Sequence, residues 1–150
     1  MSTRLVSSLA ATLGVLALTT AVQAQTVTLN PGFSPDPIEL RGVSGGVVAA
    51  KQAAGQAETP TGACVGFVDS QPDHTLELNS YFDYLRLQIS SPDDTTIVVR
   101  GPGGIWCNDD FQDKNAGIEG QWLAGTYEIW VGSYVKDKAI PYTLNVSARR

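Results

Sequence analysis

Hydrophobic and polar residues alternate along several short stretches of the chain. In Tyr84–Ile89, every second residue is leucine or isoleucine, and tyrosine, arginine and glutamine stand between them. Tyr127–Val131 and Tyr142–Val146 repeat this pattern. Because successive side chains of a strand point to opposite faces of the sheet, the alternation predicts β-strands with one buried face.

A further stretch, Thr96–Arg100, is more continuously apolar and predicts a strand that is buried on both faces. Weaker strand candidates begin at Thr26, Ile38, Val47, Cys64 and Thr75. Turn clusters rich in glycine, proline and aspartate separate the stretches at intervals of roughly 8–12 residues, which is typical of a sandwich or barrel. The pattern therefore predicts an all-β fold of one domain, an antiparallel sandwich or barrel.

Two stretches interrupt the alternation. Val47–Glu58 is rich in alanine, but it contains Gly55 and is soon followed by Pro60, so we expect a strand edge and a loop rather than a helix. Asn30–Pro37 contains three prolines, which exclude a central strand. Its one aromatic residue, Phe33, is expected to dock in the core; the alternative is that this stretch is a peptide-like ligand for another module.

The N-terminal residues have the composition of a secretion signal. Arg4 supplies a positive charge, Leu5–Leu18 is apolar or small, and small residues precede a cleavage position after Ala24. We therefore predict a signal peptide over residues 1–24 and a mature chain that starts at Gln25. The alternative is an uncleaved membrane tether, although the apolar run is shorter than the roughly 20 residues that a span requires.

The charge balance narrows the classes of partner. The chain has 10 basic and 15 acidic side chains and a formal net charge of −5, and removal of Arg4 makes it one unit more negative. An acidic surface repels phosphate groups, so nucleic acid and anionic membranes are poor partners. Apart from the signal, no apolar segment is long enough to span a membrane.

Two cysteines, Cys64 and Cys107, stand 43 positions apart. In an exported chain they most simply form one disulfide, and closing a loop of this length stabilises the fold by about 4 kcal/mol in the chain-entropy model. The spacing differs from C-x-x-C, which disfavours a redox or zinc role. On this interpretation Cys107 fixes the glycine-rich bend Gly101–Gly117 to an early strand.

The residues that catalysis would need are sparse. The single histidine, His74, follows a Pro-Asp turn, and we expect it to be a turn residue rather than a general base. No G-x-S-x-G motif is present. The adjacent pairs Asp93-Asp94 and Asp109-Asp110 lie in hydrated turns, which does not match the two separated carboxyls of a glycosidase.

The bend is rich in oxygen ligands. Calcium prefers carboxylate and amide oxygens, and such groups occur close together in this stretch. The candidate ligands are Asn108, Asp109, Asp110, Asp113 and Asn115. The spacing does not fit an EF-hand. The alternative is that these side chains only stabilise turns by bonding to their own backbone.

The tryptophans raise the question of a carbohydrate ligand. Trp106 and Trp130 are candidate ligand-binding residues, because an exposed indole can stack on a sugar ring. Trp130 alternates with Ile129 and Val131, so it is expected on the opposite face of its strand. The alternative for each tryptophan is a place in the core or as a half-buried cover over it.

Three segments carry a family resemblance. Asp93–Asp110, with its strand, Gly-Pro-x-Gly turn and acidic stretch, is followed by Leu123–Tyr134 (LAGTYEIWVGSY) and Pro141–Ser147 (PYTLNVS). Together they resemble the bacterial pre-peptidase C-terminal (PPC) domain, over about the C-terminal half of the mature chain. The resemblance implies a jelly-roll-like β-sandwich of the kind appended to secreted peptidases. Some of these domains bind polymers or calcium. As calcium ligands in this chain, the resemblance implies Asp109 and Asp110.

The chain departs from this family pattern in its expected disulfide, in an added N-terminal segment and in having no peptidase domain before it. We therefore divide it into a signal peptide (1–24), a Pro/Gly/Ala-rich segment with short strands (25–61) and a PPC-like β-sandwich (62–150). The expected function is that of a non-catalytic binding or accessory module, secreted or periplasmic, that acts on an extracellular protein or polysaccharide. The alternatives are a calcium-dependent carbohydrate-binding module and a secreted hydrolase- or protease-associated fragment.

Overall fold

A computed structural model of the chain describes residues 24–150, and the alternating stretches form strands within it. The elements are β1 (Gln25–Leu29), β2 (Ile38–Ser44), β3 (Val48–Ala49), α1 (Ala50–Ala54), β4 (Glu58–Thr59), β5 (Gly62–Ala63), β6 (Phe67–Val68), β7 (His74–Leu78), β8 (Phe82–Ser90), β9 (Thr95–Gly101), β10 (Gly104–Asn108), β11 (Gly117–Trp122), β12 (Gly125–Ser133) and β13 (Ile140–Ser147). The predicted signal peptide lies outside the described residues, except for Ala24.

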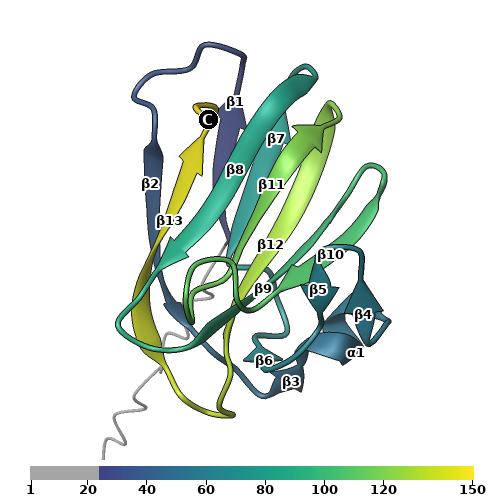
Figure 1. Cartoon of the computed structure of the whole chain (residues 1–150), viewed down its shortest axis with the longest axis vertical. Coiled ribbons are helices and arrows are strands. Elements are labelled where there is room, and N and C mark those ends of the chain that lie inside the picture. The colour runs from purple at the N-terminus through teal and green to yellow at the C-terminus, as the bar shows by residue number, and fades with distance from the viewer. Residues whose placement is uncertain (1–23) are drawn as a thin grey trace, which may run out of the picture.

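Two sheets face each other and form a β-sandwich (Figure 1). In one, β12 pairs with β7 and β9, β1 lies beyond β7, β10 lies beyond β9, and the short β6 and β3 extend the sheet. The other has the order β11-β8-β13-β2. The pairs are antiparallel except β1 and β7, which run parallel. The all-β sandwich is thus confirmed, with one parallel pair that the sequence did not predict.

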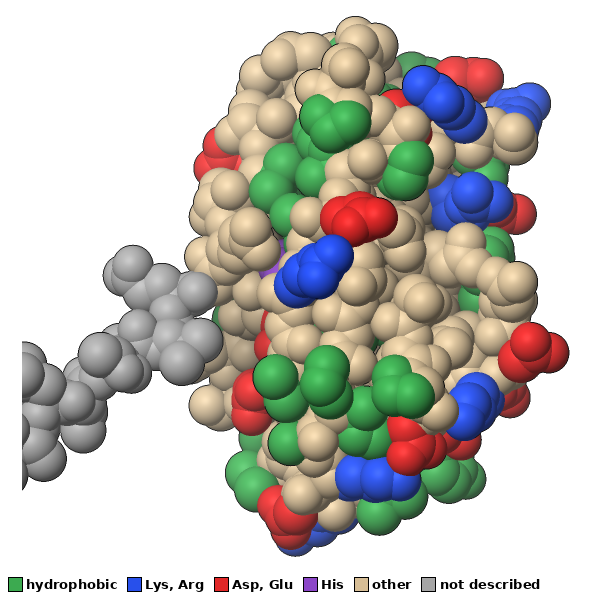
Figure 2. All heavy atoms as spheres, turned by 90° about the vertical axis from the view of Figure 1, so that its left-hand side faces the viewer, with side chains coloured by type: hydrophobic (Ala, Val, Ile, Leu, Met, Phe, Trp, Pro, Cys, Tyr) green, Lys and Arg blue, Asp and Glu red, His purple; other side chains and the backbone are tan. Residues whose placement is uncertain are grey.

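The main core fills the space between the sheets. On the face of the molecule that Figure 2 shows, hydrophobic side chains form only small separate groups among polar and charged ones. Leu85, Leu87 and Ile89 of β8 are buried, and the polar residues between them are not, as the alternation predicts. Strand β9 is buried on both faces, as predicted for Thr96–Arg100. Its Ile97 and Val99 belong to the main core, and Val98 belongs to a second cluster on the outer face of the same sheet.

The second cluster is covered by α1 and the chain around it. Ala50 and Ala54 pack there with Val68, Trp130 and the half-cystines. Cys64 and Cys107 are disulfide-bonded, as predicted, with Cα atoms 5.1 Å apart. The disulfide therefore attaches this covering segment to the edge strand β10.

Two details of the sequence analysis were wrong. Val48–Ala49 is a strand edge, but the following residues form a helix instead of a loop, because two alanines one turn apart can face the cluster. The helix ends at Gly55, which has φ of 74° and donates its N–H to the carbonyl of Gln52. His74 is the second, and its surroundings are described with the site residues below. The bend Gly101–Gly117, to which the sequence analysis gave no secondary structure, contains strand β10.

The proline-rich stretch connects β1 to β2 and is not part of either sheet. Phe33 is partly buried against the core, with its ring centroid 6.3 Å from that of Phe82, as predicted. Strand β2 pairs with β13 along Ile38–Ser44, so residues before the disulfide contribute strands to both sheets. Within residues 24–150, no helix has the length and apolar character needed to cross a membrane.

Candidate functional site

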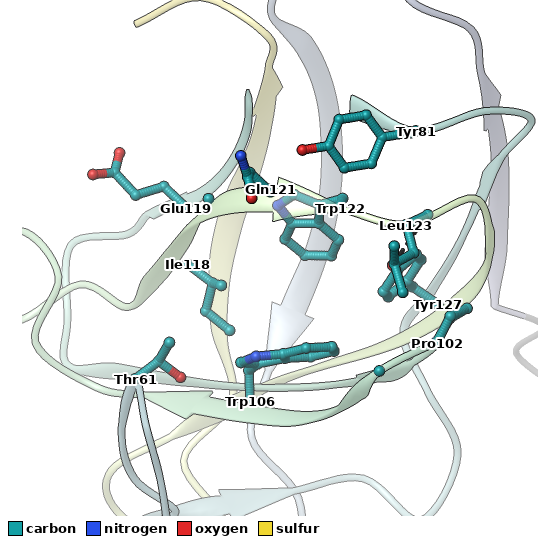
Figure 3. Close-up of a pocket in the computed structure, with 12 residues that line it drawn as sticks. Thr61, Tyr81, Pro102, Trp106, Ile118, Glu119, Gln121, Trp122, Leu123 and Tyr127 are labelled. Carbon is teal, nitrogen blue, oxygen red and sulfur yellow. Dashed lines mark hydrogen bonds between the residues drawn. The ribbon is translucent and has the colours of Figure 1, made fainter. Parts of the chain in front are cut away.

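A pocket of about 300 Å³ opens where the edge strands β10 and β11 of the two sheets approach each other (Figure 3). Its lining consists mainly of aromatic and aliphatic side chains. The residues are Thr61, Tyr81, Pro102, Gly103, Trp106, Ile118, Glu119, Gly120, Gln121, Trp122, Leu123 and Tyr127. A volume of this size lies at the lower end of the range for small-ligand sites, roughly 300–1,000 Å³.

Strand alternation places Trp106 in the pocket. In β10, Ile105 and Cys107 pack into the outer cluster, so the intervening Trp106 points between the sheets and packs against the main core. In β11, Ile118 and Trp122 are buried, whereas Glu119 and Gln121 are exposed. The sequence predicted Trp106 as a ligand-binding residue, and the structure places it in this pocket.

The pocket floor is a group of three packed aromatic rings. The ring centroids of Trp122 and Tyr127 lie 4.8 Å apart, and that of Trp106 lies 6.2 Å from Trp122 and 6.3 Å from Tyr127. These separations fall in the range of about 4.5–7 Å that favours aromatic pairs. The rings therefore hold one another in place before any ligand binds.

Internal hydrogen bonds satisfy the polar atoms of the two buried rings. The indole N–H of Trp122 donates to the carbonyl of Leu85 at 2.9 Å. The hydroxyl of Tyr127 donates to the carbonyl of Leu123, also at 2.9 Å. Both donors are used within the protein, so these rings offer a ligand mainly their π-faces and edges.

The pocket rim combines apolar and polar groups. Tyr81 and Leu123 are 47% and 51% exposed and lie on one side of the opening. Glu119 and Gln121 lie on the other, where the Glu119 carboxylate points away from the rings (Figure 3). That carboxylate accepts a 2.7 Å hydrogen bond from Tyr84, whose pKa is raised by burial and by this bond. Glu119 is the one charged residue that lines the described pocket.

The second predicted ligand-binding residue, Trp130, lies elsewhere. It is only 5% exposed and packs in the outer cluster beside the disulfide. The guanidinium carbon of Arg100 lies 5.1 Å from the centroid of its ring, at cation–π distance. The structure therefore does not bring Trp106 and Trp130 together, and the ring of Trp130 is covered by protein.

The two asparagines predicted as calcium ligands hold the acid-rich bend together. The side-chain oxygen of Asn108 accepts the N–H of Gly117, and its amide donates to the carbonyl of Thr61, both at 3.1 Å. The side-chain oxygen of Asn115 accepts the hydroxyl of Thr95 at 3.2 Å, and its amide donates to the carbonyl of Ser91 at 3.1 Å.

The aspartates of the bend lie around this framework. Burial, together with the charges of Asp110 and Asp94, raises the pKa of Asp109. Asp110 is exposed, and Asp113 occupies a turn with φ of 54°. Residues 24–150 contain no cluster of three or more His, Cys, Asp or Glu side chains arranged to hold a metal ion. A calcium site at Asn108–Asn115 remains a prediction.

His74 is not the turn residue that the sequence analysis expected. It begins strand β7, is 2% exposed, and its Nε2 lies 2.7 Å from the hydroxyl oxygen of Tyr142. Burial lowers the pKa of His74 to about 4, so the ring is neutral at pH 7. The contact could not be predicted from sequence because the two residues are 68 positions apart and lie in different sheets.

Comparisons with known proteins bear on the fold. No family model matches the chain. An uncharacterized protein of Synechococcus elongatus is 28% identical over 88 residues, which make up 56% of this chain and 65% of that protein, so the match spans less than two thirds of the relative.

Two solved structures are similar. One is the pre-peptidase C-terminal domain of a collagenase from Bacillus anthracis, with a TM-score of 0.51 and 11% identity over 86% of this chain and 99% of that one. The other is PliG from Aeromonas hydrophila, a periplasmic inhibitor of g-type lysozyme, with a TM-score of 0.43 and 15% identity over 83% and 96% of the chains. The second score is too low to support an argument. The first confirms that this chain is a PPC-like β-sandwich.

Proposed function

We propose that the chain is a non-catalytic binding module that works outside the cytoplasm and binds an extracellular protein through the aromatic pocket between β10 and β11. The observation that carries the proposal is the pre-arranged floor of Trp106, Trp122 and Tyr127 beneath an open rim. Rigid aromatic pockets of this kind bind partners at little cost in conformational entropy.

The chemistry of the lining favours an apolar side chain of a protein as the ligand. The polar atoms of Trp122 and Tyr127 are already bonded, and Tyr81 and Leu123 add apolar surface at the rim. A leucine, methionine or aromatic side chain fits such a surface, and buried anchors of this type commonly dominate protein interfaces. A polysaccharide is the second candidate, because Trp106 and Gln121 could stack on and bond to a sugar ring.

Two observations support the compartment and the absence of catalysis. The Cys64–Cys107 disulfide is typical of oxidising compartments outside the cytoplasm. The imidazole of His74 is buried against Tyr142 and bonded to it, with a pKa far below neutrality, which suits a structural role better than that of a general base.

Selection from a peptide library and a glycan array, both run on the purified disulfide-bonded protein, test the proposal. We expect selected peptides to share an apolar or aromatic anchor and to change the tryptophan fluorescence. Leu123→Ala and Trp106→Ala should each weaken binding about tenfold or more, as loss of an interface anchor does. Val135→Ala is the matched control, because Val135 is exposed but does not line the pocket.

The outcomes separate the candidates. Binding to glycans alone, lost in Trp106→Ala, would replace the protein partner with a polysaccharide. Binding that Leu123→Ala and Trp106→Ala leave unchanged would show that the pocket is not the site. Hydrolysis of an ester, peptide or glycoside by the purified protein, lost on substitution of His74, would contradict the non-catalytic role.

A further inference from the structure

A second cavity, of about 590 Å³, is lined by the first residues of β1 and β7 together with parts of β2 and β13. Its lining includes Gln25, Arg41, Asp69, Asp73, His74 and Tyr142. It shares no lining residue with the aromatic pocket. The two cavities are therefore separate, and a role for this one does not depend on the function proposed for the aromatic pocket.

The cavity has carboxylates that lack a cationic partner. Asp69 and Asp73 both line it, and neither takes part in an ion pair within residues 24–150. Arg41 lies on the same lining, but its guanidinium pairs with Glu39 at 3.5 Å. The only other titratable groups of the lining are His74 and Tyr142, which are hydrogen-bonded to each other. The cavity is thus negatively charged when both aspartates ionise.

Asp73 is held in a fixed position. Its Oδ2 accepts the backbone N–H of Val131 at 2.7 Å. Burial and the nearby charge of Asp69 raise the pKa of Asp73 to about 7. An adjacent positive charge would reverse this effect, because it favours the ionised form of the carboxyl group.

Gln25 is the first residue of β1 and lines this cavity. It lies opposite His74 in the parallel ladder. Its backbone N–H donates to the backbone carbonyl of Asp73 at 3.1 Å. Ala24, directly before it, is outside the strand. Cleavage of the Ala24–Gln25 bond would therefore leave the β1–β7 ladder complete.

We propose that the exported protein is cleaved after Ala24 and that the new α-ammonium group of Gln25 is the cationic partner of Asp73 and Asp69 in this cavity. An α-amino group has an ordinary pKa of about 7.7–8.0, so it carries a positive charge near neutrality. The nitrogen of Gln25 already lies against the Asp73 backbone, and cleavage converts it from an amide into a charged donor. Cleavage thereby adds a positive charge to a cavity whose other cation, Arg41, is paired with Glu39.

The proposal has a chemical consequence at the same nitrogen. A free N-terminal glutamine can cyclise: its amine attacks the side-chain amide carbon, a new C–N bond forms, and ammonia leaves. The product is a neutral lactam. Only the unprotonated amine is nucleophilic, so an ammonium held by the two aspartates resists cyclisation. The cyclised form keeps the same nitrogen as an uncharged amide N–H, which makes it the control for the charge.

The test uses mature protein whose N-terminus is Gln25, in the open form and in the form cyclised by a glutaminyl cyclase, each with and without Asp73→Asn. We expect cyclisation to lower the Tm of the wild-type protein at pH 7 by a few degrees and to leave the Tm of the Asp73→Asn protein nearly unchanged. Equal effects of cyclisation in both backgrounds would overturn the proposal.

Two further measurements keep the test decisive if Asp73→Asn does not fold. NMR titration of 15N-labelled Gln25 in the wild-type protein should give an α-amine pKa above the ordinary range of about 7.7–8.0, and a value within or below that range would overturn the proposal. Mass spectrometry of the exported protein should show an open glutamine at position 25. An N-terminus at any other residue, or complete cyclisation, would contradict the proposal.

Discussion

The imidazole Nε2 of His74 lies 2.7 Å from the hydroxyl oxygen of Tyr142, and this contact joins the two sheets. The two rings meet edge to face, with centroids 5.8 Å apart. The other ring nitrogen, Nδ1, is buried without a hydrogen-bond partner in the described part of the chain. The hydroxyl of Tyr142 is therefore the one hydrogen-bond partner of this imidazole within residues 24–150. Removing that hydroxyl leaves the His74 ring with no hydrogen bond.

Tyr142→Phe tests the strength of this contact. The substitution keeps the ring but leaves the buried His74 without a partner, so we expect a loss of about 1–3 kcal/mol in the free energy of unfolding, measured by urea denaturation at pH 7. Tyr84→Phe is the control, because that hydroxyl bonds to an exposed carboxylate at the surface. Equal losses in the two variants would contradict the assignment.

The buried histidine predicts a loss of stability in acid. Its pKa is about 4 in the folded protein, against an ordinary value of 6.5, so the unfolded chain binds the proton more readily between these values. The contribution of neutral His74 is complete above pH 6.5 and is lost as the pH falls toward 4. We expect it to amount to about 3 kcal/mol, read from denaturation curves of wild type and His74→Gln across this range. The same dependence of unfolding free energy on pH in the two proteins would contradict this expectation.

Asp73 should contribute the opposite dependence of stability on pH in a protein that continues N-terminally beyond Gln25. The carboxyl has a pKa of about 7 when folded and 3.8 ordinarily, so the folded chain binds the extra proton between these values. The contribution of Asp73 to stability should then fall as the pH rises from about 4 to 7, by up to about 4 kcal/mol, against the opposite contribution of His74. Asp73→Asn should remove this fall, and N-terminally extended protein with and without the substitution provides the comparison.

Reduction of the disulfide should loosen one part of the molecule more than the rest. In the chain-entropy model, the Cys64–Cys107 link contributes about 4 kcal/mol, so Cys64→Ala/Cys107→Ala should lose about that much free energy of unfolding in denaturant titrations. The covering segment over Trp130 should become sensitive to protease before the main core does, because the link attaches it to β10. Limited proteolysis with mass spectrometry identifies the cleavage sites; first cuts in the main core would contradict the expectation.

Those parts of the fold in which local pattern and tertiary burial agree could be predicted from sequence. Strand β8 alternates cleanly and is buried on one face, and the prolines around Phe33 kept that stretch outside the sheets. The disulfide followed from there being two cysteines in a chain expected to be exported. Each of these inferences needed only neighbouring residues or a count.

The candidate site was harder to predict because short glycine-containing strands build it. Strands β10 and β11 each begin at a glycine, and β11 also contains Gly120 at a register shift, so their alternation is weak. Trp106 was recognised as a candidate, but its partners Trp122 and Tyr127 come from strands that meet it only in the folded sandwich. Trp122 belongs to the opposing sheet and Tyr127 to a strand separated from β10 by β9, so no local signal connects either of them to Trp106.

The parallel pairing of β1 with β7 joins two segments that lie far apart along the chain. If the chain emerges N-terminus first from a translocation channel, Gln25–Leu29 arrives well before His74–Leu78, the strand on which it must dock. During that interval β1 has no partner strand. This edge of the sandwich is completed only once β7 is present, so a chain that folds as it emerges adds its first strand late.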